Sequence, residues 1–433
     1  MKRSASVFVV AILAALTPVH AETERSTAVS VKRLSSHINY LASDELGGRG
    51  VGSEGIELAA EYIANQFLDY GLLPGGDDGS YFQWFDVAQR RRDPDSATIK
   101  TKNVIGILPG AGPLAHEYVV FGGHYDHLGN VPPRRRPRLD NDFDPADAKI
   151  HNGADDNASG TAGVLELARI YASRPKPRRS LIFMGFSGEE LGLLGSAHFA
   201  DHPTVALEDI VAMINMDMIG RLDGRAVEVW ATGSGKGFGA FVEKHAAEIK
   251  NLQVKNETGM RFDSDHAPFY AKNIPVLFVF SGLHEDYHRP SDDVDKIDYD
   301  GAIGIVQFVQ AVADDIIQAE QRPTFQKVEN TSPRRGRRSL DLKVRMGFRP
   351  GVPDGDEQTG ISVEVVVQGG PADRAGILAG DIIIAINKTP VKNFMDYVKA
   401  VKPFKPGDQT DVTVRRGDRE VTLKVTFAGR GDG

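Results

Sequence analysis

Five short stretches of the chain offer the side chains that bind zinc and similar divalent cations. In sequence order they are GGHYDH, HNGADDNASG, SGEELGLLGS, NMDMIG and YHRPSDD. Imidazole nitrogens and carboxylate oxygens are common zinc ligands. No stretch is a contiguous metal motif such as HExxH, so the prediction of a dissected zinc site depends on the whole set. The candidate ligand atoms belong to His124, Asp155, Glu189, Glu190, Asp217 and His288.

Apolar runs alternate with helix-like segments over most of the first 320 residues. The apolar runs predict strands at 104–108, 118–121, 181–186, 211–214 and 274–280. Apolar residues at helical spacing predict helices at 31–41, 54–73, 161–171, 238–249 and 297–317. This alternation indicates an α/β fold with a mainly parallel, mixed sheet flanked by helices.

The predicted strands also explain how residues so far apart in sequence could meet. In open α/β sheets, ligands bind in the crevice outside the carboxyl ends of the strands. Most of the candidate ligands follow an apolar run within a few residues, which places them at that edge. These are His124, Glu189, Glu190, Asp217 and His288.

The motifs resemble those of a known family. Residues 34–317 are similar to the aminopeptidase-Y type of co-catalytic di-zinc metallopeptidases, through GGHYDHLG, IHNGADDNASG, FSGEELGLLGS, INMDMIGR, DSDHAPF and YHRPSDD. The resemblance implies two Zn²⁺ ions. One would be held by His124 and Asp217 and the other by Glu190 and His288. Asp155 would bridge them, and Glu189 would be the general base.

The expected chemistry accounts for these residue types. Two zinc ions about 4 Å apart need a shared carboxylate, whose two oxygens face two metals. A zinc-bound hydroxide would attack the peptide carbonyl, while Glu189 takes the water proton and delivers it to the leaving amine. Neighbouring side chains on an extended or turning backbone point differently, so Glu190 can bind metal while Glu189 stays free. The resemblance further suggests a cis peptide bond between Asp155 and Asp156.

Other residues of the motifs are expected to support the site. Asp126 resembles a carboxylate that orients the zinc-bound imidazole of His124, although it could simply cap the strand end. Tyr287 could donate a hydrogen bond to the oxyanion, and Asp265 could line the substrate pocket. His127, His151 and His266 occupy no ligand position of the family and are interpreted as structural residues or as residues that support the ligands.

The composition of the chain limits its possible partners, its chemistry and its cellular location. The chain has 433 residues, a net charge of −8 and no cysteine, which argues against nucleic acid as the main partner and excludes disulfides and thiol catalysis. Residues 1–21 combine Lys2 and Arg3 with a short apolar run and a small-residue end, which is typical of a secretory signal peptide. The sequence predicts no membrane span, and a periplasmic or secreted protein is expected.

The composition changes after the predicted peptidase domain at residues 30–320. Residues 321–339 are rich in Pro, Arg, Ser and Thr and are interpreted as a linker. Residues 340–428, with GGPADRAGILAGDIIIAINKTPV, resemble a small β-rich PDZ domain in the bacterial strand arrangement. The loop expected to bind a peptide carboxylate contains Met346, Gly347 and Phe348. An alternative role for this domain is to cover the catalytic cleft.

The sequence thus predicts an exported zinc aminopeptidase that removes N-terminal residues from peptides with a free N-terminus. Two alternatives remain. One is another reaction on the same fold, carboxypeptidase action or glutaminyl cyclisation. The other is a catalytically silent protein that binds peptides through its PDZ domain.

Overall fold

The computed structural model describes residues 29–88, 98–131, 149–249, 251–331, 344–350, 360–367, 370–392, 394–417 and 419–429. The predicted signal peptide at 1–21 lies outside these residues, as does most of the Pro- and Arg-rich stretch between the first two metal motifs. Among the described residues, no helix is long and apolar enough to cross a membrane.

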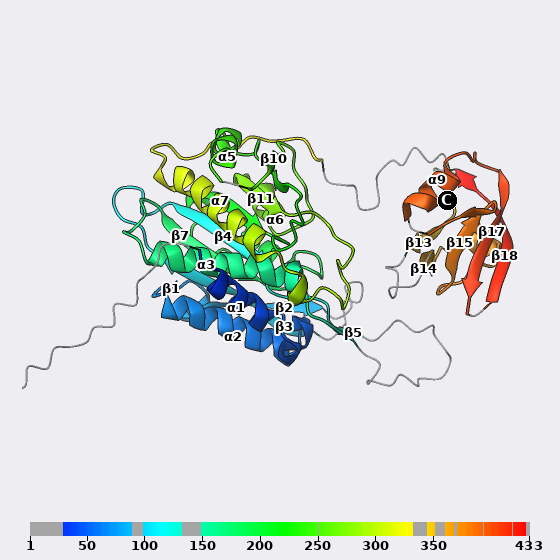
Figure 1. Cartoon of the computed structure of the whole chain (residues 1–433), viewed down its shortest axis with the longest axis horizontal. Coiled ribbons are helices and arrows are strands. Elements are labelled where there is room, and N and C mark those ends of the chain that lie inside the picture. Colours follow the sequence, from blue (N-terminus) through cyan, green and yellow to red (C-terminus); the bar gives the residue numbers. More distant parts are fainter. Residues whose placement is uncertain are drawn as a thin grey trace, which may run out of the picture.

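A mixed nine-stranded sheet forms the centre of the first domain (Figure 1). Its strands run in the order β1-β3-β7-β4-β8-β11-β9-β10, and β2 pairs with β3. The four central strands β7, β4, β8 and β11 are mutually parallel, while β3 and β9 join them antiparallel. The bounds are β1 Leu73–Pro74, β2 Phe82–Ala88, β3 Thr98–Leu108, β4 Tyr118–His124, β7 Ser180–Phe186, β8 Ile210–Met216, β9 Val227–Trp230, β10 Val254–Asn256 and β11 Val276–Phe280. A separate ribbon pairs β5 Gly129–Val131 with β6 Lys149–His151.

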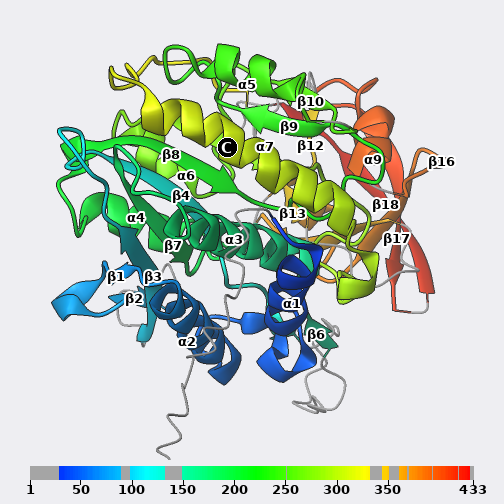
Figure 2. The same ribbon diagram turned by 60° about the vertical axis from the view of Figure 1, so that its left-hand side comes forward.

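Helices cover both faces of this sheet (Figure 2). Four helices pack on one another over one face: α1 Val31–Leu41, α2 Glu54–Asp69, α3 Gly160–Ala172 and α7 Tyr299–Gln318. Helix α5 Phe238–Ala246 packs on α7, whereas α4 Leu194–Asp201 and α6 His266–Ala271 pack together over the opposite face. Strands β4, β7 and β8 are buried along their length, which is why they read as continuous apolar runs.

The predicted elements are confirmed in type, with shifts of a few residues at their ends. Helix α2 ends at Asp69, before the predicted 73, because Gly71 adopts a left-handed φ of 78°. Helix α7 begins after Asp298, whose carboxylate accepts a hydrogen bond from the Gly301 amide at 2.9 Å. The elements of this domain that the sequence did not reveal are short or only partly apolar and include β1, β2, β5, β6, β9, β10, α4 and α6.

The segment interpreted as a linker is in part a component of the first domain. Residues 324–331 form isolated bridges with this domain, joining Phe325 to Gly235 and Asn330 to Met260. Phe325 and Val328 pack against the apolar cluster under α4 and α6. The linker prediction for 321–339 is therefore wrong for its first half. This stretch is mostly polar and exposed, so the sequence did not show that Phe325 and Val328 pack against the first domain. Residues 332–339 lie outside the described residues.

The second domain has its own apolar core and a six-stranded sheet in the order β13-β14-β15-β17-β18, with β16 paired to β15. Its elements are β12 Val344–Arg345, β13 Phe348–Pro350, β14 Ile361–Val366, α8 Pro371–Arg374, β15 Ile382–Ile386, β16 Thr389–Pro390, α9 Phe394–Val401, β17 Gln409–Arg416, β18 Arg419–Thr426 and β19 Ala428–Gly429. The buried carboxylate of Asp381, in the GDI sequence, connects separate segments of this domain. Its carboxylate accepts hydrogen bonds from Arg416 at 2.8 and 2.7 Å and from the Leu378 amide at 2.9 Å.

The predicted carboxylate loop lies between β12 and β13. Met346 is buried in the core, and its carbonyl accepts a hydrogen bond from the Ala372 amide. Gly347 has a φ of 78°, which favours glycine at the tip of this turn. Among the described residues β13 pairs only with β14, so one edge of β13 remains available.

Candidate active site

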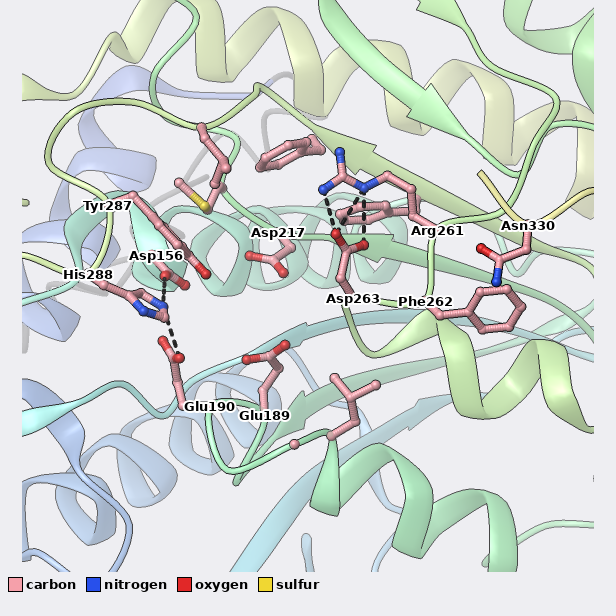
Figure 3. Close-up of a pocket in the computed structure, with 16 residues that line it drawn as sticks. Asp156, Glu189, Glu190, Asp217, Arg261, Phe262, Asp263, Tyr287, His288 and Asn330 are labelled. Atoms are coloured by element: carbon pink, nitrogen blue, oxygen red, sulfur yellow. Dashed lines mark hydrogen bonds and ion pairs between the residues drawn. The ribbon is translucent and has the colours of Figure 1, made fainter. Parts of the chain in front are cut away.

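The ends of the parallel strands bring most of the predicted ligands into one cluster. His124 is the last residue of β4 and Asp217 directly follows β8. Glu189 and Glu190 lie in the turn after β7, and His288 lies in the loop after β11. Figure 3 shows the carboxylates of Asp156, Glu189, Glu190 and Asp217 and the imidazole of His288 converging in one pocket. Apart from Asp156, which lies in the turn 154–159, each of these side chains follows the carboxyl end of a central strand, where open α/β sheets bind their ligands.

The first half of the cluster surrounds the His124 imidazole. Its Nδ1 donates a hydrogen bond to the Asp126 carbonyl at 3.1 Å, which leaves Nε2 free to bind a metal. Nε2 lies 3.4 Å from Asp217 Oδ1 and 3.3 Å from Asp156 Oδ1. Asp217 Oδ1 is buried without a hydrogen-bond partner among the described residues, whereas Oδ2 accepts one from Ser264 at 2.6 Å. A buried carboxylate oxygen that faces an imidazole nitrogen without a hydrogen-bond partner fits a cation-binding position.

The second half of the cluster surrounds the His288 imidazole. Its Nε2 lies 3.2 Å from Asp156 Oδ2 and 3.0 Å from Glu190 Oε2. Ligand atoms at the corners of a zinc tetrahedron, with bonds of about 2.0–2.2 Å, are about 3.3–3.5 Å apart. The separations in both halves are close to this spacing, and the two oxygens of Asp156 face the two histidines. Asp156 is therefore placed to bridge two metals.

The expectation that Asp155 is the bridge does not fit the structure. Asp155 points away from both histidines, and its Oδ1 accepts hydrogen bonds from the Gly220 amide at 2.6 Å and from Ser159 at 3.0 Å. Its Oδ2 lies 3.2 Å from His284. The sequence offered two adjacent acids, and only the path of the turn Ala154–Ser159 decides which one faces the metals. The expected cis peptide bond is likewise one residue later, between Asp156 and Asn157.

Asp126 is buried beside the site, but its carboxylate acts differently from the prediction. It lies 3.8 Å from His124 Nδ1, whereas it accepts hydrogen bonds from the backbone amides of Glu189 at 3.1 Å and Glu190 at 3.4 Å. Burial raises the pKa of Asp126 to about 6. Asp126 therefore fixes the turn that carries the two glutamates, and its backbone carbonyl, rather than its carboxylate, orients His124.

Glu189 is the carboxylate of the cluster that belongs to neither of the two pairs facing Asp156. Its side chain groups with those of His124 and Asp217, whereas Glu190 groups with His127 and Asp156. Burial raises the pKa of Glu189 well above its usual range, and the carboxylates of Glu190 and Asp217 add to this shift against the lowering effect of His124. A carboxylate with a raised pKa is a better proton acceptor for water.

His127 was interpreted as a structural residue or as one that supports a ligand, and the structure places it against Glu190. Its Nδ1 lies 2.8 Å from Glu190 Oε1, and because a carboxylate can only accept, Nδ1 must carry the proton. This is a hydrogen-bond distance, shorter than the spacing between the other ligand atoms. His127 thus holds one oxygen of Glu190 and leaves the other for metal. The signal in the sequence was its place three residues after His124, on the same strand end.

Two further residues that the sequence reasoning missed fix the backbone of the site. Arg49 is fully buried and donates hydrogen bonds to the carbonyls of Tyr125, Asn152 and Gly153, so it joins the His124 strand end to the Asp156 turn. Asp292 accepts hydrogen bonds from the amides of Asp155 and Asp156. Asp292 lies in the motif YHRPSDD and Arg49 in none of the motifs named above, and the contacts of both are with backbone groups, which no residue pattern specifies.

The structure places one of the two predicted substrate-binding residues at the cavity and the other away from it. Tyr287 lines the cavity beside the metal cluster and stacks on His288, with ring centroids 3.8 Å apart. Asp265 is completely buried, is absent from the cavity lining and accepts a hydrogen bond from Ser196 at 2.5 Å. The expectation that Asp265 contacts substrate is therefore wrong, because the helix α6 that it precedes turns it into the protein.

The cavity next to the metal cluster has a volume of about 620 Å³. Its apolar walls include Met218, Phe278 and Phe280, and the exposed Leu283 and Phe262 lie at its edges. The Arg261 guanidinium lies over the Phe280 ring at 5.1 Å and is paired with Asp263. A mainly apolar hollow beside a metal centre can hold a substrate side chain while the adjacent bond reacts.

Comparison with known proteins agrees with this fold and site. Residues 103–313 match Peptidase family M28, and residues 320–427 match the PDZ domain. The chain therefore consists of a peptidase domain of family M28, the co-catalytic zinc peptidases, followed by a PDZ domain. This confirms the family resemblance, the α/β fold and the β-rich second domain predicted from the sequence.

Individual relatives support the same assignment. The chain is 29% identical over 242 residues to aminopeptidase YwaD of Bacillus subtilis, an alignment that covers 52% of this chain and 46% of that protein. It thus spans about half the length of this curated relative. In fold it is similar to the solved structure of BSAP, a zinc aminopeptidase from Bacillus subtilis, with a TM-score of 0.53, 18% identity and coverage of 70% of this chain and 100% of that one.

A glutaminyl cyclase has a comparable fold. The crystal structure of Porphyromonas gingivalis glutaminyl cyclase aligns with a TM-score of 0.51 and 20% identity, covering 66% of this chain and 98% of that one. The fold alone therefore does not separate peptide hydrolysis from cyclisation.

Proposed function

We propose that this protein is a zinc-dependent aminopeptidase that removes N-terminal residues from peptides. The observation that supports this most strongly is the paired cluster around Asp156, with His124 and Asp217 on one side and Glu190 and His288 on the other. With neutral imidazoles, the carboxylates of Asp156, Glu189, Glu190 and Asp217 bring four negative charges together, which two divalent cations neutralise.

The donor set fits zinc. It consists of imidazole nitrogens and carboxylate oxygens, without thiolates, at the spacing of tetrahedral sites. Two zinc ions supply Lewis acidity that polarises the peptide carbonyl and makes a bound water acidic. His124 and Asp217 would hold one ion, Glu190 and His288 the other, and Asp156 both.

The chain's own residues carry the proton and exclude bulk water. Glu189 accepts the proton of the attacking water and returns it to the leaving amine. Tyr287, beside His288, is placed at the rim where the carbonyl oxygen gains negative charge, and its hydroxyl would donate to that oxygen. The apolar wall of Met218, Phe278 and Phe280 receives the substrate side chain, which aligns the adjacent bond with the cluster.

We further propose that the PDZ domain binds peptide C-termini and that the protein is exported. The loop Met346–Phe348 and the available edge of β13 support the first proposal, because PDZ domains add a peptide strand to a sheet edge and capture its carboxylate with backbone amides. The Lys2/Arg3 front and apolar run of residues 1–21 support the second.

A panel of peptides tests the proposed function directly. The zinc-loaded protein should hydrolyse peptides with a free N-terminus and should leave N-acetylated ones intact. Chelation should abolish hydrolysis, and elemental analysis should find two zinc ions per chain. Cyclisation of N-terminal glutamine without hydrolysis would assign the cyclase reaction instead. Release of C-terminal residues would assign a carboxypeptidase, and inertness towards every peptide would favour the silent PDZ protein.

A further inference from the structure

The chain segment that leads from the peptidase domain towards the PDZ domain is bound along the edge of the substrate cavity. We call residues 324–331 the strap. Its hydrogen bonds to the peptidase domain run from end to end. The Lys236 amide donates to Thr324 at 2.9 Å, the Gln326 amide to Ser234 at 2.7 Å, and the Met260 amide to Glu329 at 2.8 Å.

Side chains reinforce this backbone pairing. The Tyr270 hydroxyl accepts a hydrogen bond from the Val328 amide at 2.8 Å, and the Tyr270 ring lies 5.2 Å from that of Phe325. A Cβ added to Gly259 would approach Thr331 Cγ2 at 2.4 Å, so the strap and the loop before Met260 are in close contact. The strap is thus an integral part of the peptidase domain rather than a tether.

The strap also reaches the cavity itself. Asn330 is one of the lining residues, together with Arg261 and Phe262, which directly follow the strap-bound Met260. Figure 3 shows Asn330 and Phe262 on the opposite side of the pocket from Glu190 and His288. The strap therefore supplies one wall residue and holds the loop that supplies others.

We propose that the strap forms the far wall of the substrate pocket and that Asn330 limits the size of the N-terminal side chain accepted there. The inference rests on the proposed aminopeptidase function, since it assigns the cavity to the first substrate residue. The near walls are apolar, and we expect a long or aromatic side chain that extends past the stacked rings of Phe278 and Phe280 to reach Asn330, whereas alanine would not. Asn330 is then a specificity-determining residue with no role in the bond-breaking step.

A steric block at Asn330 tests this in the full-length protein. Asn330→Trp should lower kcat/KM for leucyl and phenylalanyl substrates by about tenfold or more and change it less than about twofold for alanyl substrates. The lower kcat/KM should come mainly from a higher KM, because the substituted residue does not touch the reacting atoms. The matched control is Glu329→Trp, an exposed neighbour outside the cavity lining, which should leave the leucyl-to-alanyl ratio unchanged.

Replacing the strap tests its part in holding the wall. A full-length variant with residues 324–331 exchanged for an equally long Gly/Ser sequence should keep two zinc ions and cleave alanyl substrates, but lose most of its discrimination between side chains. If this variant does not fold, the comparison of Asn330→Trp with Glu329→Trp alone tests the proposal.

The outcomes separate this inference from the proposed function. A wild-type protein that cleaves none of the free-N-terminus substrates contradicts the proposed function itself. A wild-type protein that cleaves them, with the same leucyl-to-alanyl ratio in Asn330→Trp, overturns the role of the strap. A uniform loss across all substrates would indicate only structural damage and would also reject it.

Discussion

The two ends of the substrate cavity are constructed differently. At the metal end, Asp156 and Asp217 are 3% and 8% exposed, and Asp292 and Ser264 hold them from neighbouring loops. At the far end, Phe262 is 39% exposed and lies on a loop. We infer from this difference that the proposed chemistry depends on a rigid sheet edge, whereas the proposed selectivity depends on peripheral segments, including the strap from the interdomain region.

The sharpest test of the metal end is the loss of its proton carrier. Glu189→Gln keeps the shape of the side chain but removes the basic oxygen, so turnover should fall by about 100-fold or more. Because Glu189 is not counted among the proposed ligands, elemental analysis should still find two zinc ions. Turnover near the wild-type value would remove Glu189 from the mechanism.

The metal end was largely predictable from the sequence because its residue types are dictated by chemistry. His124, Glu190, Asp217 and His288 could be placed by combining ligand type with the apolar strands that precede them. The choice between Asp155 and Asp156 could not, because both are acids and only the three-dimensional path of the turn distinguishes them. The partner of His127 could not be predicted for a related reason, since its contact with Glu190 joins two loops 63 residues apart.

The far end of the substrate cavity could not be predicted from the sequence, for a different physical reason. The strap binds mainly through backbone hydrogen bonds, to which any residue type contributes, so its Thr, Gln, Lys and Glu residues indicated a linker. The burial of Asp265 was also hidden, because a carboxylate within a family motif suggests a surface contact. The fold class was more accessible, since strands buried on both faces leave continuous apolar runs.

Separate substitutions of Asp155 and Asp156 test which of the two carboxylates bridges the proposed metal ions. Asp156→Asn removes the charge between His124 and His288, so the protein should lose at least one zinc ion and most of its activity. Asp155→Asn should retain both ions, because the Asp155 carboxylate faces Gly220, Ser159 and His284 instead. Zinc counted per folded chain by elemental analysis and circular dichroism distinguishes the two. The reverse pattern would restore Asp155 as the bridge.

His127 offers a smaller test of how the metal end is held. Removing its Nδ1 donor in His127→Leu should weaken zinc binding by about 10- to 100-fold, the usual effect of losing a group that orients a ligand. His127→Asn places an amide donor near the position of Nδ1 and should recover much of that affinity. Competition with a chelator measures both variants without relying on activity. Equal zinc affinity in His127→Leu and the wild type would show that Glu190 does not need this hydrogen bond.

The smallest expected effect concerns the PDZ domain, whose proposed contact with a peptide carboxylate would use backbone amides rather than side chains. Its candidate loop offers amides near Gly347, and a peptide ending in a free carboxylate should bind about tenfold more tightly than its C-terminal amide, because hydrogen bonds to a charged acceptor contribute about 1.5–3 kcal/mol. The full-length Glu189→Gln protein is the suitable host, since the peptide then survives the titration. Calorimetry with a matched pair of N-acetylated peptides, one acid and one amide, keeps the peptidase site from contributing. Equal affinity of the two, or no binding of either, would reject carboxylate recognition and leave covering of the catalytic cleft as the better account of this domain.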